Sequence, residues 1–213
     1  KARGGHSTIH TAIHKSTYGL AILKVFNGNH LNFGTHKNPL QHEIEMLNNL
    51  AKMSDMEFLG KHIPKVIHTG KYNKKPAFLM DYIKGMNLLN FVDKYKNYEK
   101  ESLFETKRII LGMLISILEY LHQKKIVHGD IKPVNIMVEK GTGRIVLIDF
   151  AFADIIGEKR TFPEYGTLPF ISPERLLHGV TTAEVVDDIY ALGITMFYTL
   201  EGRYPYGDHK NTV

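Results

Sequence analysis

Residues 126–152 decide the fold, and their sequence is IVHGDIKPVNIMVEKGTGRIVLIDFAF. Two short β-branched runs within this stretch are separated by a polar segment that contains two glycines, which predicts a hairpin. Asn135 precedes the first run and Asp149 follows the second, so the hairpin would bring them together, with Asp130 on the loop that enters it. Converging oxygen ligands without thiols suit Mg²⁺ held partly by substrate phosphates. The alternative is a hairpin whose acidic side chains are only solvated.

The same stretch resembles the catalytic loop of protein kinases. HGDIKPVN is similar to HRDLKxxxN, and the DFA triplet after the second run is similar to the metal-binding DFG. The resemblance implies that Asp130 orients the attacking hydroxyl, and that Asn135 and Asp149 hold Mg²⁺. Lys132 matches the serine/threonine version of the loop, where it would neutralise charge on the transferred phosphoryl group.

The composition is that of an ordinary globular protein. Its 213 residues are enough for one large domain or two small lobes. The absence of cysteine excludes disulfides and thiolate metal sites. Lys and His are spread along a chain of formal charge +5, so we expect no nucleic-acid partner. No apolar run is long enough to span a bilayer, and we expect a cytoplasmic protein.

A glycine pair near the start, Gly4 and Gly5, precedes a β-prone run. Glycines in a turn let backbone N–H groups approach phosphate oxygens. The segment resembles the glycine-rich loop of kinases, with Gly4 at its second glycine and Ile9 at the valine that follows. It departs from the pattern at the other two glycines, which are Ala2 and Ser7 here. The resemblance implies that Gly4, Gly5 and Ile9 contact a nucleotide.

Lys24 lies in an otherwise apolar strand, where a buried ammonium needs an anion or a carboxylate. This strand resembles the VAIK strand of kinases, in which the lysine reaches ATP phosphates and pairs with a helix glutamate. Asn38 before a proline predicts the start of a helix over 40–50. Glu43 on that helix is the expected partner of Lys24, with Glu45 as the alternative.

Residues 64–72 and 76–83 are two predicted strands joined by a polar turn. The end of the second strand resembles the hinge of kinases, with the pattern VMEYVxGxxL. The resemblance implies that adenine bonds to backbone groups of Asp81 and Ile83, and that Met80 is the gatekeeper behind it.

The pattern then changes from strands to helices. Residues 102–124 carry an apolar stripe of helical period, and Ser102 with Glu105 fits a capping box. A strand-rich part that precedes a helix-rich part predicts an α+β fold with two lobes. We expect an N-lobe over 1–83 and a shortened C-lobe over 84–213.

Residues 153–170 show little periodicity and predict a long loop. Its continuation GTLPFISPE, at 166–174, resembles the substrate-docking end of a protein-kinase activation segment. Small-molecule kinases of the aminoglycoside type share HGD but generally lack this stretch. Asp188 begins a predicted helix that resembles helix αF, where the aspartate anchors the catalytic-loop backbone.

Three departures from the family pattern matter. Gly129 replaces the arginine that binds a phosphate on the activation segment, which implies catalysis without loop phosphorylation. Ala151 replaces the glycine of DFG, and we expect its Cβ to disfavour flipping of Phe150. The chain stops at Val213, earlier than protein kinases usually do. This favours either truncation or a reduced kinase similar to the small effector kinases that bacteria inject into host cells.

The leading expectation is an active serine/threonine protein kinase that uses Mg-ATP. Its partners would be a protein that carries a serine or threonine hydroxyl and, as a further expectation, a chaperone. A secreted effector would act in the host cytosol. The alternatives are a nucleotide-binding pseudokinase scaffold and an aminoglycoside-type small-molecule kinase.

Overall fold

The structure is a computed structural model with two compact units, Lys1–Ile83 and Lys84–Val213. It describes residues 2–3, 7–13, 18–27, 38–53, 57–98, 101–162, 166–179 and 181–207. Gly4 and Gly5 lie outside the described residues.

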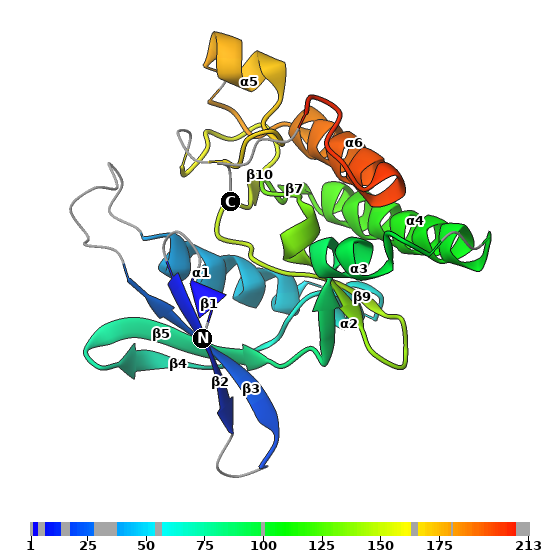
Figure 1. Ribbon diagram of the computed structural model, residues 1–213. Coiled ribbons are helices and arrows are strands. Elements are labelled where there is room, and N and C mark those ends of the chain that lie inside the picture. Colours follow the sequence, from blue (N-terminus) through cyan, green and yellow to red (C-terminus); the bar gives the residue numbers. More distant parts are fainter. Residues whose placement is uncertain are drawn as a thin grey trace. The chain divides into compact units, whose positions relative to one another are not determined.

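The first unit is built on a five-stranded antiparallel sheet in the order β1-β2-β3-β5-β4 (Figure 1). Its strands are β1 (Ala2–Arg3), β2 (Ser7–Ile13), β3 (Leu20–Phe26), β4 (Val66–Tyr72) and β5 (Lys75–Asp81). The expected hairpin of β4 and β5 is present. Its two turn residues, Asn73 and Lys74, have positive φ angles of 49° and 66°, the backbone that matches strand twist in two-residue hairpins.

Helix α1 (Pro39–Lys52) packs against β4 and β5, and a short helix, α2 (Leu59–His62), follows it. The start of α1 is fixed as the sequence predicts: Asn38 Oδ1 accepts a hydrogen bond of 2.8 Å from the backbone N–H of Gln41, and Pro39 occupies the first turn. The apolar face of α1 is buried at Leu40, Ile44, Leu47 and Leu50.

The second unit is mainly helical and carries two small sheets. One has the order β6-β8-β9 and the other pairs β10 with β7. The elements of this unit are β6 (Gly85–Asn87), α3 (Leu88–Tyr95), α4 (Glu101–Gln123), β7 (Ile126–Val127), the 3-10 turn η2 (Pro133–Asn135), β8 (Ile136–Glu139), β9 (Ile145–Leu147), β10 (Asp154–Ile155), α5 (Pro173–His178) and α6 (Val185–Glu201). A strand-rich first unit and a helical second unit confirm the α+β class.

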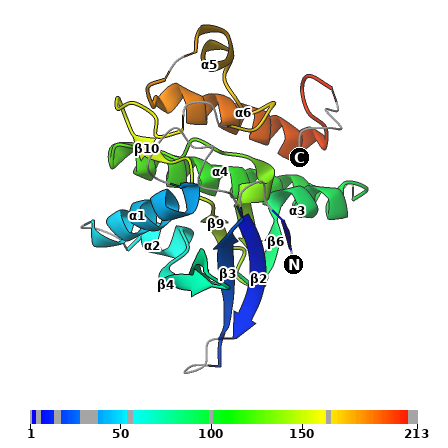
Figure 2. The same cartoon turned by 90° about the vertical axis from the view of Figure 1, so that its left-hand side faces the viewer.

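Helices α4 and α6 lie side by side in both ribbon views (Figures 1 and 2). Their facing residues form the core of the second unit, with Leu114, Ile117 and Leu121 fully buried on α4. The expected cap at Ser102 is wrong, because α4 already begins at Glu101 and the Ser102 carbonyl accepts a bond of 2.8 Å from the Thr106 hydroxyl.

A capping box occurs instead at the start of α6. Asp187 in its first turn accepts a hydrogen bond from the backbone N–H of Glu184, and the Glu184 side chain accepts one from the backbone N–H of Asp187.

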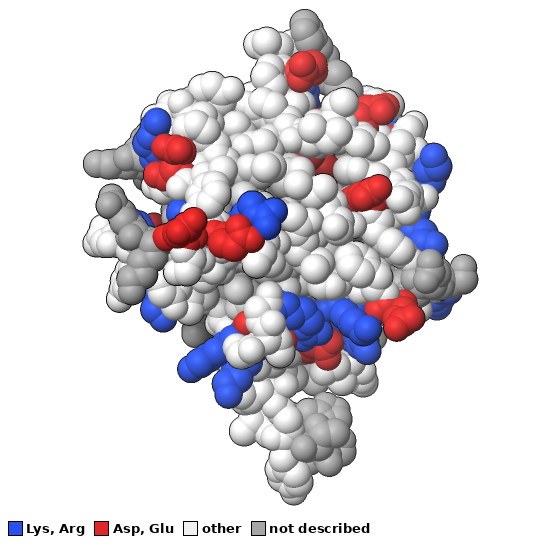
Figure 3. All heavy atoms as spheres, turned by 90° about the vertical axis from the view of Figure 1, so that its right-hand side faces the viewer, with Lys and Arg blue, Asp and Glu red and all other residues white. Residues whose placement is uncertain are grey.

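The surface carries charges of both signs. On the face shown in Figure 3, Lys and Arg side chains lie interspersed with Asp and Glu and with uncharged residues. Among the described residues, no helix combines the length and the apolar character that crossing a membrane requires.

Candidate active site

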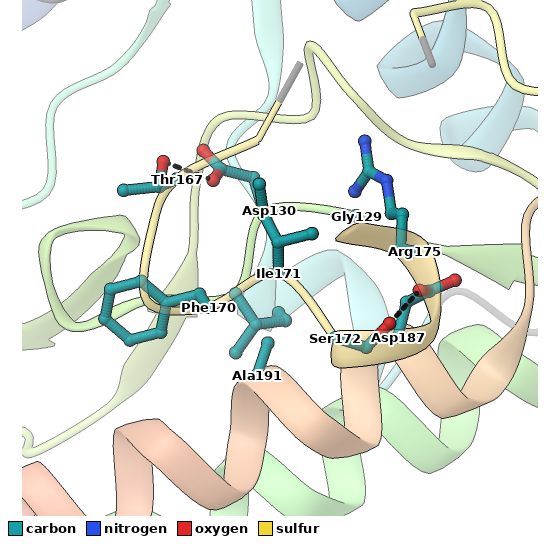
Figure 4. A pocket seen from close by; sticks show the side chains of 10 residues that line it. Gly129, Asp130, Thr167, Phe170, Ile171, Ser172, Arg175, Asp187 and Ala191 are labelled. Atoms are coloured by element: carbon teal, nitrogen blue, oxygen red, sulfur yellow. Dashed lines mark hydrogen bonds between the residues drawn. The ribbon is translucent and has the colours of Figure 1, made fainter. Parts of the chain in front are cut away.

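Asp130 is the centre of a buried polar cluster on the loop between β7 and η2, with 4% of its surface exposed. Its Oδ2 accepts a hydrogen bond of 2.9 Å from Asn135 Nδ2 and lies 2.7 Å from Lys132 Nζ. Its Oδ1 accepts a bond of 3.0 Å from the Thr167 hydroxyl, shown as a dashed line in Figure 4. Lys132 Nζ also donates to that hydroxyl, at 2.6 Å. The structure therefore brings Asp130, Lys132 and Asn135 together.

Thr167 is the member of this cluster that the sequence did not single out. Its stretch, GTLPFISPE, resembles a docking segment, but neither spacing nor periodicity indicates that its hydroxyl meets a residue 37 positions earlier. The Thr167 bond shows that Asp130 can accept a hydrogen bond from a threonine hydroxyl while an ammonium stands beside it.

Asp188 on α6 holds the loop that carries Asp130. It is fully buried, and its two oxygens accept hydrogen bonds from the backbone N–H groups of His128, at 2.8 Å, and Gly129, at 2.9 Å. His122 Nε2 on α4 lies 2.9 Å from the same carboxylate. The backbone of the loop is thus tied to the core helices, which keeps Asp130 in a fixed position.

His128 is a buried, neutral side chain behind Asp130. Its Nδ1 accepts a bond of 3.3 Å from the Asp130 N–H, so Nε2 is assigned the proton and donates to the Ile148 carbonyl at 3.2 Å. Its ring meets that of Phe150 edge-on, with centroids 4.7 Å apart. Burial lowers the pKa of His128, against the opposing effect of the Asp188, Asp130 and Asp149 carboxylates.

The predicted hairpin brings the backbone of Asn135 opposite Ile148, the residue before Asp149. Strands β8 and β9 pair in antiparallel register, and the Ile148 N–H donates to the Asn135 carbonyl at 2.9 Å. The Asn135 Nδ2 donates to both Oδ2 and the backbone carbonyl of Asp130, which leaves its Oδ1 to act as an acceptor or a ligand.

This donor set fits Mg²⁺. One amide oxygen and one carboxylate are hard oxygen ligands, and Mg²⁺ in proteins takes one or two carboxylates together with water and substrate phosphates. The part of the chain that the structure describes contains no cluster of three or more His, Asp or Glu side chains that could hold a metal alone. A cation at Asn135 and Asp149 would therefore need further ligands from a substrate.

In the first unit, Lys24 on β3 and Glu43 on α1 form a buried ion pair. The Lys24 Nζ lies 2.6 Å from Glu43 Oε2, and only 7% and 0% of the two side chains are exposed. The pair expected from the sequence is thus present, with Glu43 and not Glu45 opposite Lys24. Removing either partner of such a buried ion pair would leave the other charge uncompensated.

Three of the other residues expected to contact a nucleotide, Ile9, Met80 and Asp81, lie on the same sheet. Ile9 on β2 is the direct neighbour of Lys24, and Met80 on β5 pairs with Ile22, so these side chains share a face with Lys24. The Asp81 N–H donates a hydrogen bond of 3.2 Å to the Lys65 carbonyl.

Comparisons with known proteins agree with this geometry. A family model described as the protein kinase domain matches residues 2–213. A probable serine/threonine-protein kinase of Dictyostelium discoideum is 28% identical over 214 residues, which are 98% of this chain and 43% of that protein. Serine/threonine-protein kinase PrkC of Bacillus subtilis is 34% identical over 149 residues, 68% of this chain and 22% of PrkC. The chain spans less than half the length of these relatives.

Proposed function

Since the chain belongs to the protein kinase family, we propose that it transfers the terminal phosphoryl group of Mg-ATP to a serine or threonine hydroxyl of a protein. The observation that carries this proposal is the contact between Asp130 and a threonine hydroxyl, at 3.0 Å, with Lys132 Nζ 2.6 Å from the same hydroxyl. Phosphoryl transfer to a hydroxyl requires two groups at the acceptor. One is a carboxylate that accepts a hydrogen bond from the hydroxyl, and the other is a cation beside the hydroxyl oxygen.

The remaining roles follow from the charges. Bound Mg-ATP supplies the phosphoryl group and the cation that neutralises it. Lys24, held by Glu43, would bind phosphate oxygens, and the oxygens of Asn135 and Asp149 would hold Mg²⁺. Asp130 would orient the incoming hydroxyl while Lys132 neutralises negative charge beside it. Catalysis of this kind depends mainly on positioning and electrostatics.

The nucleoside would be held by groups of the first unit. We assign adenine to the carbonyl of Asp81 and a backbone group of Ile83, because the Asp81 N–H is already bonded to Lys65. Met80 would close the space behind the base and Ile9 would cover it. Gly4 and Gly5 would bind phosphate oxygens, and only their resemblance to the glycine-rich loop of kinases supports this role.

We also propose that activity does not require phosphorylation of the segment after Asp149. Gly129 offers no side chain to bind a phosphate. Thr161, a candidate acceptor, donates its hydroxyl to Asp154 Oδ1 at 2.7 Å, and Asp154 is only 6% exposed. A phosphate on Thr161 would therefore face a buried carboxylate, which disfavours a stabilising role.

The non-arginine catalytic loop supports a further hypothesis, that this kinase domain acts as a bacterial effector in the host cytosol and is delivered with a chaperone. A translocation reporter fused to the chain tests it. A signal from the host cytosol that depends on a secretion system is expected, and its absence in every secretion-competent host would contradict the hypothesis.

The proposed activity is tested with radiolabelled ATP and Mg²⁺, on generic protein substrates and a cell lysate, with Asp149→Ala as the matched control. Label on protein serines or threonines with the wild type alone is the expected result. ATP-dependent thermal stabilisation without transfer would instead indicate a scaffold. Turnover that appears only with aminoglycoside hydroxyls would indicate a small-molecule kinase.

A further inference from the structure

Asp187 lies where three separate segments of the second unit meet. It precedes Asp188 on α6 but contacts different groups, and 8% of it is exposed. Its Oδ1 accepts a hydrogen bond of 3.1 Å from the Ser172 hydroxyl, shown in Figure 4. Its Oδ2 accepts bonds from the Glu184 N–H, at 3.2 Å, and from the Arg160 guanidinium. One carboxylate therefore joins residues on both sides of Thr167 to α6.

Arg160 is more deeply buried than its partner, with 4% exposed. Its Nη1 lies 3.7 Å from the point where a Cβ on Gly129 would stand, so the guanidinium is next to the catalytic loop. Its Nε has no hydrogen-bond partner among the described residues. Asp187 is thus the carboxylate that forms an ion pair with this buried guanidinium.

Backbone pairing holds the same region against the strand-like stretch before α6. The Arg160 N–H donates to the Thr181 carbonyl at 2.7 Å, and the Gly157 N–H donates to the Ala183 carbonyl at 2.8 Å. The Ala183 N–H returns a bond of 2.9 Å to the Glu158 carbonyl. These backbone bonds fix residues 157–160, before Thr167, and the bond from Ser172 to Asp187 fixes the chain after Thr167.

We propose that Asp187 is a positioning residue: through Arg160 and Ser172 it fixes both ends of the segment that presents Thr167 to Asp130. The inference rests on the proposed function and deepens its regulation. In the family pattern an arginine of the catalytic loop binds a phosphate on the segment. Here the two charges have changed places. The cation, Arg160, is on the segment and the anion is the Asp187 carboxylate on α6, so the segment is held without phosphorylation.

If the Arg160–Asp187 pair only stabilises the fold, a different result is expected. Removing one partner of a buried ion pair leaves an uncompensated charge and destabilises the fold, whereas replacing both partners with uncharged groups is often neutral. Stability should then return in a double variant, and activity should return with it. A positioning role predicts that stability returns and activity does not.

The experiment compares Arg160→Met, Asp187→Asn and the double variant with the wild type. Both single variants should lower the Tm, and the double variant should recover most of the loss. In all three variants, the KM for the generic protein substrate of the transfer assay should rise about tenfold, as expected for loss of one charge-assisted contact. The KM for ATP should stay within about twofold. Lys107→Met is the control: it removes a 3.1 Å bond to the Leu200 carbonyl at the other end of α6 and should leave both KM values unchanged.

Hydrogen exchange of residues 166–174 gives a readout that does not require catalysis. Faster exchange there in Asp187→Asn and in the double variant, but not in Lys107→Met, would support the positioning role. A double variant that recovers the wild-type KM together with its Tm would overturn it, and so would unchanged exchange. Absence of phosphate transfer by the wild type would instead count against the proposed function, and the exchange comparison would still decide the role of Asp187.

Discussion

Gly129 adopts a backbone conformation that strongly disfavours any residue with a Cβ. Its φ is +77°, and a Cβ built on it would lie 2.4 Å from the Phe152 carbonyl oxygen. We therefore expect Gly129→Ala to lower the free energy of unfolding by about 2–5 kcal/mol, the sum of a left-handed backbone and a clash that forces backbone shifts. Urea unfolding measures this loss.

Gly143 offers a matched control at this scale. Its φ is +70°, but nothing lies within 4 Å of a built Cβ, so Gly143→Ala should cost only the left-handed backbone, about 1–2 kcal/mol. Equal losses at the two positions would show that the Phe152 contact is unimportant. At this backbone an arginine could not replace Gly129 without a shift of the Phe152 carbonyl.

Thr161 distinguishes a structural threonine from a regulatory one. Thr161→Ala removes the 2.7 Å bond to Asp154 and should cost about 1 kcal/mol of stability while kcat/KM stays within about threefold. Thr161→Glu places a second carboxylate at buried Asp154 and should lower the Tm further. Kinase assays and thermal unfolding check both. Loss of activity in the alanine variant that the glutamate variant restores would contradict phosphorylation-independent activity.

At the scale of elements, the ion pair between Lys24 and Glu43 joins β3 to α1. Glu43→Gln leaves a buried ammonium without its carboxylate and should cost about 3–5 kcal/mol in urea unfolding. The double variant Lys24→Met/Glu43→Leu should recover most of that loss but bind no ATP. Glu105, whose pair with Arg108 is exposed, is the control, and Glu105→Gln should leave the unfolding midpoint unchanged. Equal effects of Glu43→Gln and Glu105→Gln would contradict the role of burial.

Local signals in the sequence predicted the elements well wherever they were strong. The hairpin of β8 and β9, the cap at Asn38 and the strand that carries Lys24 each depend on neighbours a few residues apart. The start of α4 was misplaced because Ser102 and Glu105 satisfy the capping pattern from inside the first turn.

Contacts between distant residues could not be predicted from pattern alone. Arg160 and Asp187 are 27 positions apart, and Arg160 lies in a stretch without periodicity, so no spacing rule indicates that they meet. The contact between Asp188 and the loop backbone, 59 positions away at Gly129, was expected only because the helix resembles a known family. Tertiary packing decides both.

At the scale of the whole molecule, stability should depend on pH through His128. Burial holds the pKa of this imidazole below its usual value, despite the Asp188, Asp130 and Asp149 carboxylates that face it. The unfolded chain therefore binds a proton, as pH falls through about 6.5, that the folded chain does not bind. This contribution to stability is complete above that pH and is lost progressively below it.

The measurement is the free energy of unfolding of the wild type and His128→Asn between about pH 8 and pH 5.5, the range in which an ordinary histidine titrates. The wild type should lose more stability than the variant as the pH falls, because only the wild type gains a proton at this position on unfolding. Because the folded protein binds no proton at His128 over this range, the bond of 3.3 Å from the Asp130 N–H to His128 Nδ1 should be kept, and activity should not fall through this imidazole. Parallel slopes for the wild type and His128→Asn would show that the imidazole titrates normally and that the assigned hydrogen-bond pattern behind Asp130 is wrong.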